Sequence, residues 1–218
     1  MTIIPFPTQA REPLAFTIGA RVDLRVGALA GGVVRPRGEA ENVFAFSSIA
    51  RVLRNARMAW RERGLHAPLT LAVPSSIHAE LDADMLTEAA FEAGCTRQRL
   101  SFELCEQALA DGALNLADRL RAGGWGIVLR AASTCLLPFG KHARTLFNEL
   151  VIEAPNTPDP YLALEASDES ALGQRLLAAR AAGITLVAES VQGVAHARKL
   201  AIAGFERGGG PFAEAGLR

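Results

Sequence analysis

Short apolar runs that resemble β-strands alternate with longer helical segments along most of this chain. The strand-like runs lie at residues 69–73, 100–104, 125–129, 150–152 and 184–188. Segments with apolar residues three or four positions apart predict helices at 48–63, 77–93, 107–122, 168–182 and 193–203. A regular alternation of this kind is typical of a parallel sheet covered by helices, so it predicts an α/β fold.

The predicted strands are apolar at consecutive positions rather than at every second one. Strands of this type are covered on both faces, as they are in a closed barrel. The 218 residues can form one such domain, and no interdomain linker interrupts them. We therefore expect a single TIM-like (β/α) barrel over residues 14–218, with its first strands at 14–24 and 28–34, after an irregular proline-containing leader at 1–13.

Two glutamates end strand-like runs and mark a candidate site. Glu103 closes the run Leu-Ser-Phe-Glu-Leu, and Glu189 directly follows the run at 184–188. Parallel α/β proteins carry their chemistry at the carboxyl ends of their strands, where such side chains meet. The alternative is structural: both glutamates would form salt bridges with Arg130 or another basic group inside the barrel mouth.

Charge and cysteine content exclude several classes of protein. Lys and Arg total 23, as do Asp and Glu, so the zero net charge does not favour a nucleic-acid or anionic membrane partner. The three cysteines form no CxxC pair, which suggests a reducing compartment. No signal peptide is recognisable, and no run approaches the roughly 20 apolar residues of a membrane span. We expect a cytoplasmic protein.

Five segments, in order, resemble the EAL domain, the barrel of cyclic di-GMP phosphodiesterases. Leu-Ser-Phe-Glu-Leu-Cys-Glu at 100–106 is similar to the family's Phe-Glu-Leu-Thr-Glu strand. Leu-Val-Ala-Glu-Ser-Val-Gln at 186–192 is similar to its Ala-Glu-Gly-Val-Glu-Thr segment. The remaining three are Gly-Gly-Val-Val-Arg-Pro at 31–36 (the naming motif Glu-Ala-Leu-Leu-Arg), Leu-Ala-Val-Pro-Ser-Ser at 71–76 (Val-Asn-Leu-Ser) and Leu-Val-Ile-Glu at 150–153 (Lys-Ile-Asp). The resemblance covers roughly residues 14–212 and implies an EAL-type barrel.

The same resemblance implies a site for one or two divalent ions, held by carboxylates and an Asn, that activate water against a phosphodiester. This chain departs from that pattern at most positions. The replacements are Gly31 for the naming-motif Glu, Pro74 for Asn, Arg130-Ala131 for an Asp pair, Val151 for Lys, Gln192 for a second Glu and Gly209 near a late Gln. Glu103, Glu189 and Glu153 remain as a vestigial site. We therefore predict no catalytic residues, no metal, no cofactor and no phosphodiesterase activity.

The leading functional hypothesis is a catalytically inactive EAL-like domain that acts as a protein-interaction or regulatory module in bacterial signalling, in motility or cell-cycle control. Its protein partner is unidentified. The alternative is a receptor that binds cyclic di-GMP without hydrolysing it. Phosphate recognition would then use Arg35, the retained Arg of the naming motif, together with Arg130. An active phosphodiesterase is a third alternative.

Three other segments allow more than one interpretation. The arginines of the helix at 48–63 form either a solvated face or a docking face for an acidic protein. Gly208-Gly209-Gly210 lacks the flanking residues of a P-loop, so a loose turn is favoured over a phosphate cradle. Residues 131–147 correspond, by the resemblance, to the segment that couples dimerisation to the active site. They form a core plug or an exposed apolar patch, and a homodimer remains open.

Overall fold

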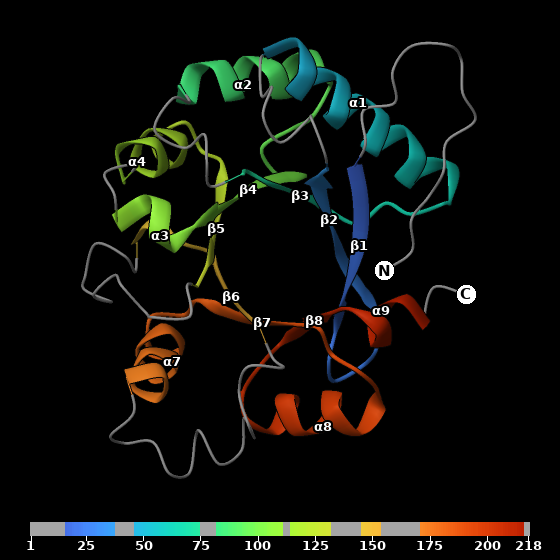
Figure 1. Cartoon of the computed structure of the whole chain (residues 1–218), viewed down its shortest axis with the longest axis vertical. Coiled ribbons are helices and arrows are strands. Elements are labelled where there is room, and N and C mark those ends of the chain that lie inside the picture. The colour runs from blue at the N-terminus through green and yellow to red at the C-terminus, as the bar shows by residue number, and fades with distance from the viewer. Residues whose placement is uncertain are drawn as a thin grey trace.

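The protein is a closed barrel of eight strands surrounded by helices (Figure 1). The structure, a computed structural model, describes residues 16–37, 46–74, 82–110, 114–131, 145–153 and 171–215. Neighbouring strands in the chain are neighbours in the barrel. They are β1 (Phe16–Asp23), β2 (Leu29–Pro36), β3 (Leu69–Ala72), β4 (Leu100–Cys105), β5 (Gly126–Arg130), β6 (Glu149–Glu153), β7 (Thr185–Glu189) and β8 (Arg207–Gly209). The predicted single-domain TIM-like barrel is confirmed.

The first strand runs against all the others. β1 pairs antiparallel with both β2 and β8, whereas every pair from β2 to β8 is parallel. A tight turn joins β1 to β2, and Gly27 takes a positive φ of 72° in it, a conformation that suits glycine. Because β1 is reversed, Phe16 lies opposite Pro36, at the end of the barrel where the parallel strands finish.

The helices cover the outside of the strand ring. Their bounds are α1 (Phe46–Glu62), α2 (Ala83–Glu92), α3 (Glu106–Ala108), α4 (Leu114–Ala122), α7 (Ala171–Ala181), α8 (Val194–Ile202) and α9 (Pro211–Ala215). In α1, apolar residues at helical spacing, including Ile49, Leu53 and Ala56, are fully buried. Within the described residues, no helix is both long enough and apolar enough to cross a membrane.

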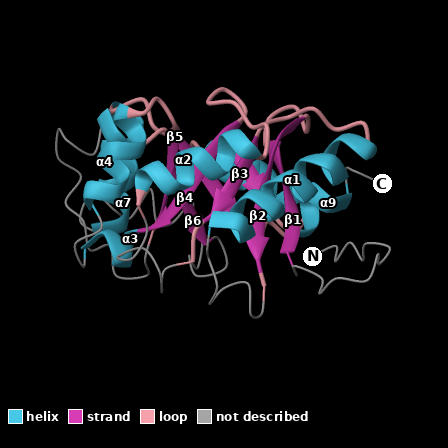
Figure 2. Ribbon diagram, turned by 90° about the horizontal axis from the view of Figure 1, so that it is seen from above, coloured by secondary structure: helices cyan, strands magenta, loops and turns pink. Residues whose placement is uncertain are grey.

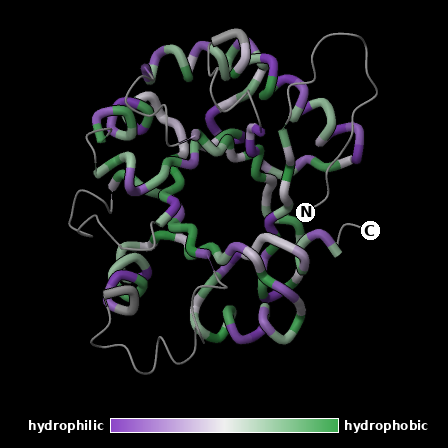
Figure 3. Tube along the Cα trace, viewed as in Figure 1, coloured by the Kyte–Doolittle hydropathy of each residue, from purple (hydrophilic) through white to green (hydrophobic). Residues whose placement is uncertain are grey.

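The main hydrophobic core lies between the strands and the helices, outside the ring. Phe102 of β4 and Trp125 are fully buried there, with ring centroids 5.4 Å apart in an edge-on arrangement. Figure 3 shows hydrophobic residues along the strand ring, interrupted by hydrophilic positions. The space inside the ring is different: a small separate cluster of Val128, Val151 and Val187 shares it with charged side chains. This polar interior sets the chemistry of the molecule.

The structure corrects two expectations and leaves others outside the described residues. Gly208 and Gly209 belong to strand β8 rather than to a loose turn, because they pair with Val22 and Arg21 of β1. The helix expected at 107–122 is described as two helices, α3 and α4. The leader at 1–13 and most of the segment at 131–147 lie outside the described residues.

Candidate functional site

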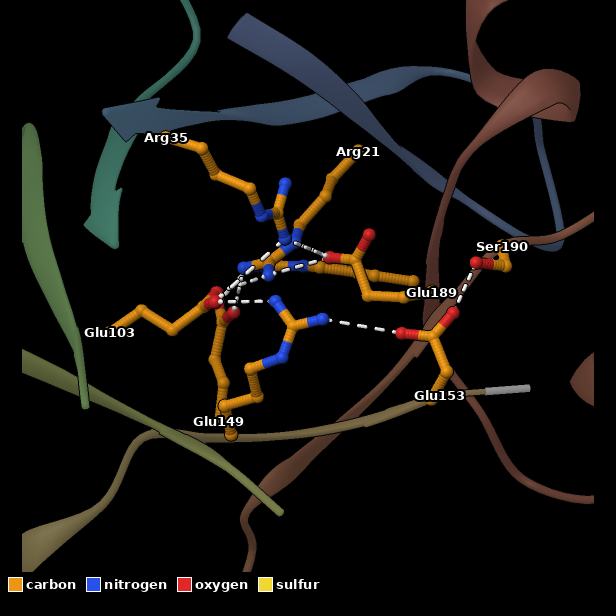
Figure 4. Close-up of polar contacts among 9 residues, drawn as sticks. Arg21, Arg35, Glu103, Glu149, Glu153, Glu189 and Ser190 are labelled. Carbon is orange, nitrogen blue, oxygen red and sulfur yellow. Dashed lines mark hydrogen bonds and ion pairs between the residues drawn. The ribbon is translucent and has the colours of Figure 1, made fainter. Parts of the chain in front are cut away.

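A buried arginine occupies the centre of the barrel. Arg21 of β1 is only 3% exposed, and its Nη2 atom lies 2.6 Å from Glu103 Oε2 and 2.8 Å from Glu189 Oε1. Its Nε donates a further hydrogen bond of 3.1 Å to Glu189 Oε1. The remaining amino group, Nη1, faces Glu149 Oε2 at 3.5 Å. Figure 4 shows the carboxylates turned toward this one guanidinium. One cation therefore links β1 to β4, β6 and β7.

Strand geometry explains why Arg21 points inward. Ala20 and Val22, on either side of it, pack against Ala213 of α9, so the intervening residue faces the barrel interior. The cross-strand neighbours of Arg21 are Gly31 and Gly209, which carry no side chain. Residues opposite one another on paired strands share a face. The space that two inward side chains would take is thus free for Arg21.

Two further arginines lie nearer the mouth, at the carboxyl ends of the parallel strands. Arg35 Nη2 is 3.2 Å from Glu189 Oε1. Arg130 Nη1 is 3.3 Å from Glu103 Oε1, and its Nη2 is 3.2 Å from Glu153 Oε2. The expected ion pair between Glu103 and Arg130 is therefore present. Unlike Arg21, the side chains of Arg35 and Arg130 are 25% and 37% exposed, so both can still meet a molecule in solution.

The ion pairs extend along the whole barrel. At the amino-terminal end of the parallel strands, Glu149 also pairs with Arg207. At the mouth, the Ser190 hydroxyl donates a hydrogen bond to Glu153. The network therefore joins four arginines to four glutamates, and its formal charges cancel. We call these eight residues the interior ion network: Arg21, Arg35, Arg130, Arg207, Glu103, Glu149, Glu153 and Glu189.

Ionisation inside the barrel follows from this pairing. Burial alone would raise the pKa of Glu189, but the charges of Arg21, Arg35 and Arg130 oppose it, and the pKa ends below its ordinary value. Burial alone would lower the pKa of Arg21, but Glu103, Glu189 and Glu149 together raise it above its ordinary value. Both groups are therefore charged at neutral pH. A carboxylate with a lowered pKa is a weak general base.

The five site residues singled out from the sequence are brought together. Glu103, Glu189, Glu153, Arg35 and Arg130 all belong to the interior ion network. Whether the two arginines bind phosphate stays a prediction.

Sequence reasoning missed Arg21, Glu149 and Arg207. Arg21 stands between apolar residues in a strand, which places it on the opposite strand face from them. In a barrel covered outside by helices, that face is the interior. The alternation of apolar and charged residues in this strand could therefore have indicated that Arg21 points inward.

A divalent cation does not fit between Glu103 and Glu189. Such ions bind oxygen at about 2.0–2.6 Å, and an ion placed between these carboxylates would occupy the space of the Arg21 guanidinium. Val128 and Val151 offer no oxygen ligand from the neighbouring inward positions. Gln192 is exposed, and its side-chain amide donates to the Ser190 carbonyl at 2.9 Å instead of reaching the interior.

A small cavity opens at the mouth above the ion network. It has a volume of about 190 Å³, and its walls include Arg35, Arg130, Glu153, Glu189 and Ser190. Ser190 takes a positive φ of 60°, unusual for a residue with a side chain, where the chain turns away from β7. Drug-sized ligands occupy cavities of roughly 300–1,000 Å³. The space bounded by described residues is therefore suited to a phosphate group rather than to a whole dinucleotide.

Comparison with known proteins identifies the fold. No family model and no curated protein matches the sequence. The EAL domain of Mycobacterium smegmatis DcpA superposes with a TM-score of 0.65 at 18% identity, over 93% of this chain and 96% of that one. The PaMucR phosphodiesterase in complex with cyclic di-GMP gives 0.67 at 18% identity, over 89% and 93%.

The EAL enzyme Bd1971, bound to cAMP and cyclic di-GMP, gives a TM-score of 0.67 at 15% identity over 93% of this chain. This chain spans only 64% of the length of Bd1971. At such low identities the likeness establishes the fold. The expectation of an EAL-type barrel is confirmed at that level.

Proposed function

We propose that this chain is a non-catalytic domain with the EAL fold that serves as a protein-interaction or regulatory module in bacterial signalling, in motility or cell-cycle control. The observation that carries the proposal is the position of Arg21, whose guanidinium bonds Glu103 and Glu189 at once. Hydrolysis of the kind implied by the resemblance needs these carboxylates as ligands of a divalent ion. Here a side chain of the protein itself neutralises them.

The energetics favour Arg21 over a metal in this position. A metal would have to displace a guanidinium that is held by three carboxylates and removed from water. Removing one partner from a buried ion pair costs about 3–5 kcal/mol, because the other charge is left uncompensated. The neighbouring cations Arg35 and Arg130 would in addition repel a second positive ion.

A second candidate function is supported by the mouth cavity. Solved structures with the same fold include complexes with cyclic di-GMP, the PaMucR phosphodiesterase among them. Arg35 and Arg130 are partly exposed and line the cavity, and guanidinium groups bind phosphate through paired hydrogen bonds. A receptor that binds cyclic di-GMP through a phosphate, without hydrolysis, is therefore the alternative.

One protein preparation tests both functions. Incubation with cyclic di-GMP and Mg²⁺ or Mn²⁺, followed by chromatography, should yield no linear product, with the PaMucR phosphodiesterase as positive control. Product that disappears in Glu103→Gln would refute the non-catalytic proposal. Titration calorimetry with cyclic di-GMP on the same sample separates the two candidates. Heat that is lost in Arg130→Ala would favour the receptor, and no heat would favour the interaction module.

A further inference from the structure

A second cavity lies at the opposite end of the barrel from the mouth. It opens between α1 and the loops that lead into β3 and β4, the amino-terminal ends of those strands, and has a volume of about 170 Å³. Figure 2 shows the described loops collected along this end. Trp60, Leu65 and Leu69 provide its apolar wall, and Cys95 lies beside them. Among the described residues, this cavity shares none with the mouth or with the interior ion network.

Three arginines surround the cavity, and none of them pairs with a carboxylate of a residue that the structure describes. Arg57 donates to the Gly94 carbonyl, and Arg99 Nη1 donates to the His66 carbonyl at 2.6 Å. The guanidinium of Arg61 makes no hydrogen bond or ion pair with any residue that the structure describes, and no Asp or Glu is among the described residues of the wall. The acceptors that hold the other two guanidiniums are neutral carbonyls, so no described carboxylate compensates the positive charge.

The arrangement is preorganised. Gly94 has a positive φ of 72°, and a Cβ there would lie 2.6 Å from Arg57 Nη1, so the missing side chain lets the guanidinium sit against the loop. Arg57 Nε is shielded from solvent and makes no hydrogen bond within the described structure. The Trp60 indole is fixed by a 3.0 Å hydrogen bond to the Ala67 carbonyl. The guanidinium of Arg57 and the indole of Trp60 are therefore held in place by neutral backbone acceptors before any ligand enters.

The field of these arginines reaches the wall of the cavity. Burial raises the pKa of the Cys95 thiol, while the charges of Arg57 and Arg61 act in the opposite direction. The buried Cys95 thiol does not offset the positive charge of the arginines. That charge therefore remains available to a solute that enters the pocket.

We propose that this pocket binds a small phosphate-bearing anion, either inorganic phosphate or the phosphate group of a small monoester. Guanidinium forks match the oxygens of phosphate, and the second negative charge of phosphate near neutral pH balances more of the arginine charge than a carboxylate does. The apolar wall of Trp60, Leu65 and Leu69 provides room for a small organic substituent beside the phosphate.

The two tryptophans of the chain provide a reporter of binding and an internal reference in the same sample. Trp60 lines the pocket, whereas Trp125 is fully buried in the core, with its indole donating to Thr87 Oγ1 at 2.9 Å. Titration of ¹⁵N-labelled protein with inorganic phosphate at constant ionic strength should shift the indole signal of Trp60 and leave that of Trp125 in place. Trp60→Phe assigns the two signals.

Matched variants connect the shift to the arginines. Arg61→Gln should weaken phosphate binding about tenfold or more, since a charge-assisted hydrogen bond is lost and no described contact of the fold depends on Arg61. Arg51→Gln removes the same charge from the same helix but outside the pocket, and should leave the affinity unchanged.

Three results would each overturn the proposal. They are a motionless Trp60 signal, equal weakening by Arg51→Gln and Arg61→Gln, and an acetate titration that reproduces the phosphate response. Comparison of inorganic phosphate with phenyl phosphate then separates the free ion from a monoester, because only the ester also contacts the apolar wall.

Discussion

Arg21 combines the functions of a core residue and a counter-ion. It is buried in the barrel interior, and three strands lose a charge partner if it is removed. Buried ion pairs contribute little net stability compared with well-packed apolar groups, but they are costly to break from one side. Removal of Arg21 should therefore cost more stability than its ion pairs contribute to the intact protein.

Replacement of Arg21 by methionine should destabilise the fold by about 3–5 kcal/mol, because Glu103 and Glu189 would be left as close, buried like charges. Urea denaturation measures the change. Arg51→Met, on an exposed face of α1, should stay within about 0.5 kcal/mol of the parent. Mn²⁺ should raise the midpoint of Arg21→Met and leave that of the parent unchanged. A parent that is also stabilised by Mn²⁺ would contradict the role given to Arg21.

The acidic half of the interior ion network could be predicted from sequence better than the basic half. Glu103 and Glu189 end apolar runs, so their location at strand ends follows from the pattern. The partner of both, Arg21, is 82 and 168 positions away in the chain, and a pairing of that separation exists only after the barrel closes. Glu149 begins strand β6 rather than ending it, so it does not stand at the strand end where functional side chains are expected.

Strand β8 is the element that was hardest to predict from the sequence. Its three residues, Arg207, Gly208 and Gly209, carry two glycines, which favour turns over strands when taken locally. The tertiary structure overrides that preference, because a Cβ at Gly209 would lie 2.8 Å from Glu189 Oε2. The strand needs glycine at this point so that the ion network can fill the interior. The helices, by contrast, follow from apolar spacing, as α1 illustrates.

Gly209→Ala should therefore displace the Glu189 carboxylate from Arg21 and destabilise the protein by about 1–3 kcal/mol, the range for overpacking. The matched control is Gly193→Ala, where nothing lies within 4 Å of the added Cβ and the backbone is extended. Thermal unfolding of the two variants measures the difference. Equal midpoints would show that the space around Gly209 is not limiting.

Positive and negative charges are balanced both in the barrel interior and over the complete chain. The interior ion network is neutral, and the complete chain is neutral too. The network runs from Arg207 at one end of the barrel to Glu153 at the other.

Stability should decline in acid. The pKa of Glu189 is lower in the folded protein than in the unfolded chain, where it is about 4.3. Its contribution is therefore complete above that value and is lost as the pH falls through the folded pKa. Arg21 has a raised pKa and stays protonated throughout this range.

Urea unfolding from pH 7 to pH 3 should show a flat free energy and then a fall below about pH 4. Glu189→Gln should be less stable at neutral pH and should approach the parent in acid. A constant difference between the two proteins over the whole range would contradict the assignment.

The reversed direction of β1 also decides how this barrel connects to other chain segments. β1 starts at Phe16 beside Pro36, and α9 follows β8 and contributes Glu214 to the wall of the mouth cavity. Both covalent exits of the described domain are thus on the rim of the same opening. A domain or peptide fused at either exit is tethered there at a high effective concentration, so even a weak ligand for Arg35 and Arg130 would occupy the mouth once it is attached.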